Sequence, residues 1–349
     1  MTVALKPRLT KRILLFVLLG LLTLLLYFYY FVGAVNVADV IKRTNLFYYA
    51  LAFIATLVSV FFYSLTWHSL LSNLAVKIRI RRALLLTWVG RFFDAIVPEP
   101  GWSGDLSKAY MLAKTSGQDV GRIAASVVGQ RVIGTVVVVV NLILGLALLV
   151  WHYTLPSAVL IFIAVVLFLS ILSLVIICYL SAKPKATKRI LDWMIRAISF
   201  VRRGHWNPLD FRLKAEGILN KFHEGIRTLS ADPRALVRPV AFFLLGWGFD
   251  VSVIFLTFAS LGYPVLVDKV LIVYALTGIL QSMGISFVGF TEIVMSSSYS
   301  VLGVPLAVSL SATLLTRVVT LWFELIVSYI AFQWAGVEIL LGRKPTGAQ

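Results

Sequence analysis

The chain has 349 residues, of which 60% are hydrophobic and only 13% are charged. This composition excludes a soluble globular domain and indicates a protein that crosses a membrane several times. Lysine and arginine together number 32 against 15 acidic residues, but the positions of the basic residues indicate a membrane topology rather than nucleic-acid binding, so no nucleic acid is expected as a partner.

Six apolar segments are long enough to cross a bilayer, which takes about 20 residues in a helix. In chain order they are 13–35, 46–71, 123–150, 157–180, 240–261 and 305–334. A signal peptide is the competing interpretation of the first segment, but its apolar core is too long and lacks a small-residue cleavage site. The sequence therefore predicts an all-α polytopic membrane protein with six full transmembrane helices.

A shorter apolar run, 83–97, ends at Pro98, where a break rich in proline and glycine cannot continue a helix. A second short helix would start near Ser103 and end near Ala113. Irregular backbone at membrane depth is tolerated only where protein or a water-filled cavity satisfies it. We therefore expect a re-entrant helical hairpin over 83–113, which enters the membrane and returns to the same side.

The same design recurs over 270–303, where a short apolar run again ends in a break of small residues. When the two hairpins are aligned without gaps, Asp105 falls opposite Glu292, and one residue of slippage then brings Arg131 opposite Arg317. Each half of the chain thus has an acid at its break and an arginine about 25 residues later, on the next long helix.

The one extended polar region, 182–238, holds 13 lysines and arginines. Apolar side chains recur in it at helical spacing, first over 190–201 and again over 211–229. This pattern predicts two amphipathic helices, the first lying in the headgroup layer, rather than a separate domain. A solvated linker with helical propensity is the alternative.

The basic residues also predict the orientation of the chain. With the N-terminus in the cytoplasm and each hairpin returning to its own side, 25 of the 32 basic residues fall in cytoplasmic segments and three fall outside. Both termini are then cytoplasmic in a multi-pass protein of the cell membrane. The two hairpins enter from opposite sides, so residues 1–150 and 151–349 are expected to form two inverted-topology repeats, an architecture of alternating-access transporters.

Two arginines lie near the middle of their helices, where a charge is costly and usually pairs with another charge or lines a polar path. The expected partner of Arg131 is Asp105 or Glu99, and that of Arg317 is Glu292. Two roles are open for these pairs. They bind substrate, or they are buried ion pairs that only hold the hairpins to the long helices.

The breaks between the short helices favour an anion site. Their glycines permit close approach of the backbone, helix N-termini favour anions, and a guanidinium binds phosphate through two parallel hydrogen bonds. The candidate substrate-binding residues are Glu99, Gly101, Gly104, Asp105, Lys108, Arg131, Gly289, Glu292 and Arg317.

Other charged residues within apolar segments are given no part in this site. Arg91 and Asp94 are three residues apart and are predicted to form a local pair. Glu324 lies two helical turns from Arg317 on the same face, and Asp250 lies inside a predicted span.

The chain carries no P-loop and no catalytic triad or zinc-protease motif. Its single cysteine, Cys178, and four scattered histidines offer neither a disulfide nor a metal cluster. We therefore expect no enzymatic activity, no metal and no cofactor.

These residues resemble the transmembrane family of lysylphosphatidylglycerol synthases, also called the flippase-like domain family, over roughly residues 10–335. The family pattern is a proline followed by Gly-Gly-Asp and a basic residue, then Glu-Arg on the next helix, and in the second half a glycine-rich break ending in Glu and a later Arg. Its counterparts here are Pro98, Gly101, Gly104, Asp105, Lys108, Gln130, Arg131, Gly289, Glu292 and Arg317. The chain departs from the pattern at Ser103, Lys108 and Gln130, where the family has glycine, arginine and glutamate.

In the synthases this region moves an aminoacylated lipid between leaflets, and a separate soluble domain makes that lipid. The resemblance therefore implies a flippase without synthase activity, which moves an anionic lipid or a polyprenyl-phosphate-linked glycolipid by alternating access. The alternative is a non-catalytic membrane subunit that anchors or regulates a lipid-modifying or glycosyltransferase partner through 182–238. A membrane-embedded transferase is the least favoured reading. The expected partners are anionic headgroups of the cytoplasmic leaflet and the transported lipid, and association with further copies of the chain is left open.

Overall fold

The computed structural model describes residues 39, 41–97, 102–152, 157–201, 208–282 and 289–340, and these residues form helices without strands. Five helical segments are long and apolar enough to cross a membrane. They are Leu46–Asn73, Val120–Leu148, Ile163–Ala182, Pro233–Ser260 and Leu306–Gly336. These segments match five of the six predicted spans, and the remaining one, 13–35, lies outside the described residues. The chain is thus an all-helical, multi-pass membrane protein.

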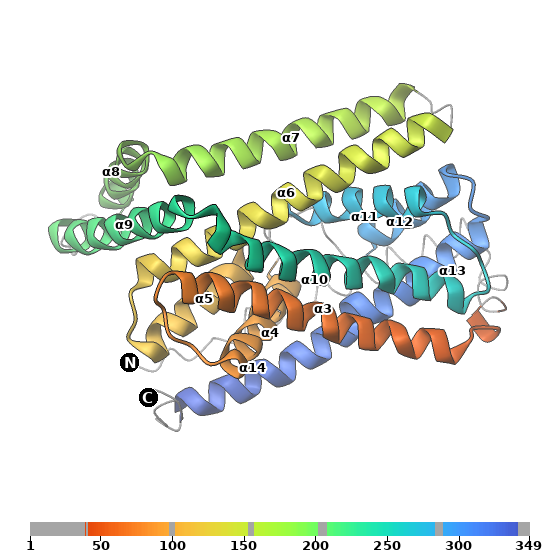
Figure 1. The fold of residues 1–349 in the computed structure, drawn as a ribbon, viewed down its shortest axis with the longest axis horizontal. Coiled ribbons are helices and arrows are strands. Elements are labelled where there is room, and N and C mark those ends of the chain that lie inside the picture. Colours follow the sequence, from red (N-terminus) through yellow and green to blue (C-terminus); the bar gives the residue numbers. More distant parts are fainter. Residues whose placement is uncertain are drawn as a thin grey trace.

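Figure 1 shows the long helices running side by side along the longest dimension of the molecule, with shorter helices between them and at one end. The helices are α3 (Leu46–Asn73), α4 (Ile80–Ile96), α5 (Ser103–Ser116), α6 (Val120–His152), α7 (Ser157–Ala182), α8 (Pro184–Val201), α9 (Pro208–Ala231), α10 (Pro233–Ser260), α11 (Val267–Ser282), α12 (Phe290–Val301), α13 (Leu306–Arg317), the π-helix η1 (Val318–Phe323) and α14 (Glu324–Leu340).

Helices α3 and α10 form an antiparallel pair that spans the length of the bundle (Figure 1). At one end the N–H of Asn45, which caps α3, donates to the carbonyl of Ser260 at 2.7 Å. At the other end the Asn73 side chain donates to the carbonyl of Ala235 at 2.8 Å. Small residues such as Ala52 are buried on α3, which lets the two helix backbones approach closely.

Helices α4 and α5, of 17 and 14 residues, are both shorter than a membrane span. The start of α4 and the end of α5 lie close together. The Gln118 side chain, just after α5, donates to the carbonyl of Lys77, just before α4, at 3.0 Å. Where the two helices cross, an added Cβ on Gly104 would overlap the carbonyl of Gly90. Close packing of this hairpin therefore requires glycine at position 104.

Helices α11 and α12, of 16 and 12 residues, repeat this arrangement. Gly303, just after α12, lies beside the side chain of Lys269 at the start of α11, so the start of α11 and the end of α12 also lie close together. Figure 1 shows α4 and α5 in the half of the bundle that carries α8 and α9, and α11 and α12 in the opposite half.

The polar region contains two helices, as expected. On α8, which is strongly amphipathic, Trp193 is 65% exposed. Helix α9 instead packs across the end of α6, where Arg122 and Glu224 form an ion pair at 3.1 Å. A hydrogen bond from Lys221 lowers the pKa of the Glu224 carboxyl.

The next span begins earlier than the apolar pattern predicts. Asp232 accepts a hydrogen bond from the N–H of Arg234 at 3.0 Å, and Pro233 occupies the first helical position. Both are helix-start signals. The first turns of α10 are therefore basic and belong to the helix rather than to the polar region 182–238.

The last membrane segment is not a regular α-helix. Six residues of π-helix, η1, separate Arg317 at the end of α13 from Glu324 at the start of α14. A π-helix turns through a smaller angle per residue than an α-helix, and such stretches are frequent at functional sites. The spacing of Arg317 and Glu324 in the sequence therefore does not fix their relative direction.

Candidate functional site

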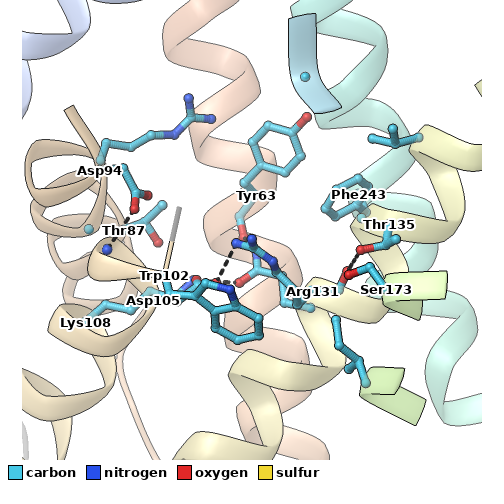
Figure 2. Close-up of a pocket in the computed structure, with 18 of the residues that line it drawn as sticks. Tyr63, Thr87, Asp94, Trp102, Asp105, Lys108, Arg131, Thr135, Ser173 and Phe243 are labelled. Atoms are coloured by element: carbon cyan, nitrogen blue, oxygen red, sulfur yellow. Dashed lines mark hydrogen bonds and ion pairs between the residues drawn. The ribbon is translucent and has the colours of Figure 1, made fainter. Parts of the chain in front are cut away.

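A cavity of about 350 Å³ lies among membrane helices from both halves of the chain, with its charged side chains from the first half. Figure 2 shows residues around it, and the lining comes from α3, α4, α5, α6, α7, α10 and α11. Three basic side chains and two carboxylates lie in its wall. They are Arg91, Lys108, Arg131, Asp94 and Asp105. Charges placed inside a membrane protein generally mark a substrate or ion pathway.

Asp105 joins the two basic residues on the α5 and α6 side of the cavity. Its carboxylate lies 2.8 Å from the Lys108 ammonium and 3.4 Å from the Arg131 guanidinium. Of the two partners expected for Arg131, Asp105 and Glu99, the structure shows the pair with Asp105, and Glu99 lies outside the described residues. The guanidinium also lies over the indole ring of Trp102, 4.5 Å from its centre, as Figure 2 shows. A cation above an aromatic face is held in orientation as well as stabilised.

Lys108 is only 6% exposed, and its position is fixed from three sides. Besides Asp105, its ammonium donates to the Gln130 side chain at 2.9 Å and lies 5.1 Å from the centre of the Trp67 ring. The Gln130 amide in turn donates to the carbonyl of Tyr63 at 3.1 Å. A buried lysine bound in this way presents a fixed positive charge to the cavity.

The N-terminus of α5 is occupied by a carboxylate of the chain itself. Asp94 accepts hydrogen bonds from the N–H of Gly104 at 2.8 Å and from the Ser103 hydroxyl at 3.2 Å. The expectation that this helix start would offer its amides to an anionic substrate is therefore corrected. The acid that complements the helix dipole comes from α4, because the hairpin brings the end of α4 against the start of α5.

The predicted local pair of Arg91 and Asp94 is also corrected. Arg91 donates to Glu324 at 2.9 Å and lies over the ring of Tyr63, 5.6 Å from its centre. This ion pair joins α4 in the first half of the chain to α14 in the second half. The π-helix η1 precedes Glu324, so the direction of the Glu324 side chain differs from that in a regular α-helix.

In the second half, the predicted pair of Arg317 and Glu292 is confirmed, with 2.7 Å between the guanidinium and the carboxylate. The other oxygen of Glu292 accepts the N–H of Gly289 at 2.6 Å, so this helix start is also capped internally. Gly289 has φ of +97°, a conformation that favours glycine. Both ends of the ion pair are buried and neither lines the cavity.

The structure thus divides the residues predicted from the sequence into two groups. Gly104, Asp105, Lys108 and Arg131 meet at the cavity. Gly289, Glu292 and Arg317 meet in a sealed ion pair of the other half. Glu99 and Gly101 lie outside the described residues.

Sequence reasoning missed several residues of the cavity wall, among them Tyr63, Trp102, Phe243, Ser170 and Ser173. Each is an ordinary residue for a membrane helix or a turn when it is considered alone. A usable signal existed for Arg91 and Asp94, which are ionisable residues within an apolar run and also line the cavity.

The whole cavity region falls within a match to a family model, that of the lysylphosphatidylglycerol synthase transmembrane region, which covers residues 13–328. The chain is also similar along most of its length to three archaeal proteins described as UPF0104 membrane proteins. The relative from Pyrococcus horikoshii is 22% identical over 92% of this chain and 95% of its own length. The relative from Methanothermobacter thermautotrophicus is 22% identical, over 88% and 91% respectively, and that from Methanocaldococcus jannaschii is 26% identical, over 93% and 95%.

Proposed function

The chain belongs to the lysylphosphatidylglycerol synthase transmembrane family, and we propose that it is a flippase that moves a lipid with an anionic headgroup between the two leaflets. The lipid is a phospholipid or a polyprenyl-phosphate-linked glycolipid. The protein acts by alternating access, without synthase activity.

The observation that carries this proposal is the charged cavity between membrane helices. Its volume of about 350 Å³ is at the small end of the range for ligand pockets, which suits a headgroup better than a whole lipid. Arg131 lies at the wall with its guanidinium held by Asp105 and Trp102. A guanidinium in a fixed orientation can bind a phosphate through two hydrogen bonds.

Helix α7 supports a lateral route for the lipid. Ser170 and Ser173 of α7 line the cavity, whereas Phe168, Leu172 and Val175 of the same helix are exposed, as expected for a surface that faces acyl chains. We infer that the headgroup moves along the polar side of α7 while the acyl chains remain in the bilayer. Helix α7 is apolar with a short polar face, so one side of it can contact the headgroup while the other contacts acyl chains.

The two ion pairs support an inverted-repeat transporter with six spans and two re-entrant hairpins. The side chains of Arg131 and Asp105 are 21% and 17% exposed at the cavity, whereas those of Arg317 and Glu292 are 8% and 4% exposed. In alternating access, equivalent elements of two inverted repeats exchange roles. We therefore propose that the two pairs exchange exposure during transport. When the Arg317–Glu292 pair becomes exposed to a cavity, the Arg131–Asp105 pair becomes buried.

We also propose that the protein lies in the cell membrane with α8 and α9 on the cytoplasmic side. Four basic side chains lie along α8, where they can contact the anionic headgroups of that leaflet. They are Lys185, Lys188, Arg189 and Arg196. This location agrees with the excess of basic residues in the predicted cytoplasmic segments.

Proteoliposomes that contain the purified chain test the proposal. A phosphatidylglycerol with a fluorescent acyl chain, or a fluorescent polyprenyl phosphate, is bleached from outside by a membrane-impermeant reductant. The wild-type chain should increase the fraction that is bleached, and Arg131→Gln should abolish the increase. Arg122→Gln, on the same helix but in an exposed ion pair with Glu224, should behave as the wild type. Failure of the wild-type chain with both lipids would contradict a flippase and favour the accessory subunit.

A further inference from the structure

Asp250 is an ionisable residue in the interior of α10, a helix that is long and apolar enough to span a membrane. Three hydroxyl groups donate to its carboxylate. Ser59 of α3 donates to one oxygen, and Tyr63 of α3 and Tyr274 of α11 donate to the other at 2.8 Å and 3.4 Å. The carboxylate is half-buried rather than sealed. An ionisable side chain at this depth is costly and is generally retained for function.

The ring of Tyr63 connects this carboxylate to the cavity. Its hydroxyl binds Asp250, while its ring lies in the cavity wall beneath the guanidinium of Arg91. Arg91 is bound on its other side to Glu324. The charge of Asp250 acts on both Arg91 and Glu324, and Arg91 also interacts with Asp94.

The groups that face Asp250 come from the helices around α10. The titratable side chains in contact with it are Tyr63 of α3 and Tyr274 of α11, and its charge also acts on Arg91 of α4 and Glu324 of α14. The charged residue that ends α13, also packed against α10, is Arg317, and it is bonded to Glu292. On α6, another neighbour of α10, the charge that faces the cavity is Arg131, which is bonded to Asp105.

We propose that Asp250 is a proton-binding site and that its protonation is coupled to binding of the headgroup in the cavity. This inference rests on the proposed function of the cavity. A hydronium ion gives up its proton to one carboxylate oxygen and becomes water, and a hydroxyl group that had donated to that oxygen turns to accept the new hydrogen bond. Both tyrosines and the serine keep their own protons. Hydroxyl groups suit such a site because they act as donors and as acceptors.

Protonation changes the charge that the headgroup meets. When Asp250 is neutral, Arg91 is opposed only by Glu324 and Asp94, so the wall of the cavity becomes more positive and binds an anion more tightly. By linkage, binding of an anionic headgroup raises the affinity of Asp250 for a proton by the same factor. Proton and headgroup then bind together and leave together, so a proton gradient can drive transport of the lipid.

Binding to the purified full-length chain in detergent tests the coupling, with a soluble short-chain phosphatidylglycerol as the probe. The wild-type affinity should rise by about tenfold from alkaline to acidic pH, within the range typical of coupled sites. Asp250→Asn mimics the neutral carboxyl and should bind at all pH values as the wild type does at low pH. Tyr63→Phe keeps the ring under Arg91 but removes the hydroxyl group, and should shift the midpoint of the pH dependence. Glu224→Gln, on exposed α9, is the matched control and should retain the wild-type profile.

A pH dependence of binding that persists unchanged in Asp250→Asn would overturn the proposal. A sodium dependence at constant pH that Asp250→Asn removes would also overturn it, because the site would then hold sodium. Infrared difference spectra of the lipid-free protein report the protonated carboxyl group directly, through a C=O band that should appear at low pH and be missing in Asp250→Asn. That band would be seen even if the chain bound no lipid, so failure of the flippase proposal and failure of the proton site are distinguishable. Its absence from the wild type would refute the site.

Discussion

The carboxylate of Asp94 lies 2.8 Å from the N–H of Gly104, and this contact joins the two short helices of the first hairpin. It places an acid of α4 at the N-terminus of α5, a position that would otherwise attract an anion from outside. The positive groups left to meet a substrate at this cavity are therefore side chains, chiefly Lys108 and Arg131, rather than backbone amides.

The first prediction concerns the space that this contact needs. A Cβ at position 104 would overlap the Asp94 carboxylate and the Gly90 carbonyl, so Gly104→Ala should force the hairpin apart. Overpacking of this kind typically costs about 1–3 kcal/mol, and loss of the cap adds about 0.5–2 kcal/mol. The measurement is thermal unfolding of the purified protein in detergent.

Gly248 of α10 is the matched control, because a Cβ there meets nothing within 4 Å. Gly248→Ala should leave the unfolding temperature unchanged or raise it, since alanine is the better helix former. An equal loss of stability in both variants would show that the close contact between Asp94 and Gly104 does not contribute to the stability of the protein.

The sequence predicted the long helices and the two arginine–acid pairs for a physical reason. The length of an apolar run measures a membrane span directly, and a charge such as Arg317 in the middle of such a run requires a partner. Glu292, the acid at the facing break, was the evident partner. The same reasoning offered Asp105 or Glu99 as the partner of Arg131, and the structure shows the pair with Asp105 as well as that of Arg317 with Glu292.

The contact between Arg91 and Glu324 could not be predicted in this way. The two residues are 233 positions apart, and Asp94 offered a nearer acid on the same helix. In addition, no apolar pattern signals the π-helix η1, which changes the direction of Glu324. The hydroxyl groups around Asp250 could not be predicted from the sequence either. They come from two other helices, and serine and tyrosine are common in membrane helices.

The second prediction tests the re-entrant path of the first hairpin. In a Cys178→Ser background, cysteines introduced at Lys77 and Lys114 should both react with an impermeant thiol reagent from the cytoplasmic side alone. The reason is the contact between Lys77 and Gln118, which holds the two ends of the hairpin together. Labelling of the two positions from opposite sides would mean that 83–113 crosses the membrane, and the inverted-repeat proposal would fail.

The third prediction concerns α8. A peptide that covers residues 184–201 should become helical on anionic vesicles, because its exposed apolar side chains, including Ile190 and Trp193, can enter the interface. Each basic residue near the surface contributes about 1 kcal/mol at low salt, so binding should weaken as salt is added. Circular dichroism and vesicle sedimentation measure the two effects. Equal binding to neutral vesicles would contradict the electrostatic part.

The last prediction separates the structural from the transport role of the central arginines. Arg317 and Glu292 are both buried, and removal of one partner from a buried pair costs about 3–5 kcal/mol. Arg317→Met should therefore destabilise the protein strongly, and addition of Glu292→Gln should recover much of that stability.

If alternating access uses the pair, the stable double variant should still fail to move lipid in proteoliposomes. Arg131→Lys gives the parallel test at the open cavity. It keeps the charge near Asp105 but loses the planar guanidinium that can bind phosphate through two hydrogen bonds, so transport should fall sharply while the unfolding temperature changes little. Restored transport in the double variant of Arg317 and Glu292 would assign that pair a structural role alone. We expect stability without transport, because Arg317 and Arg131 follow their acids by 25 and 26 residues in two halves of one fold.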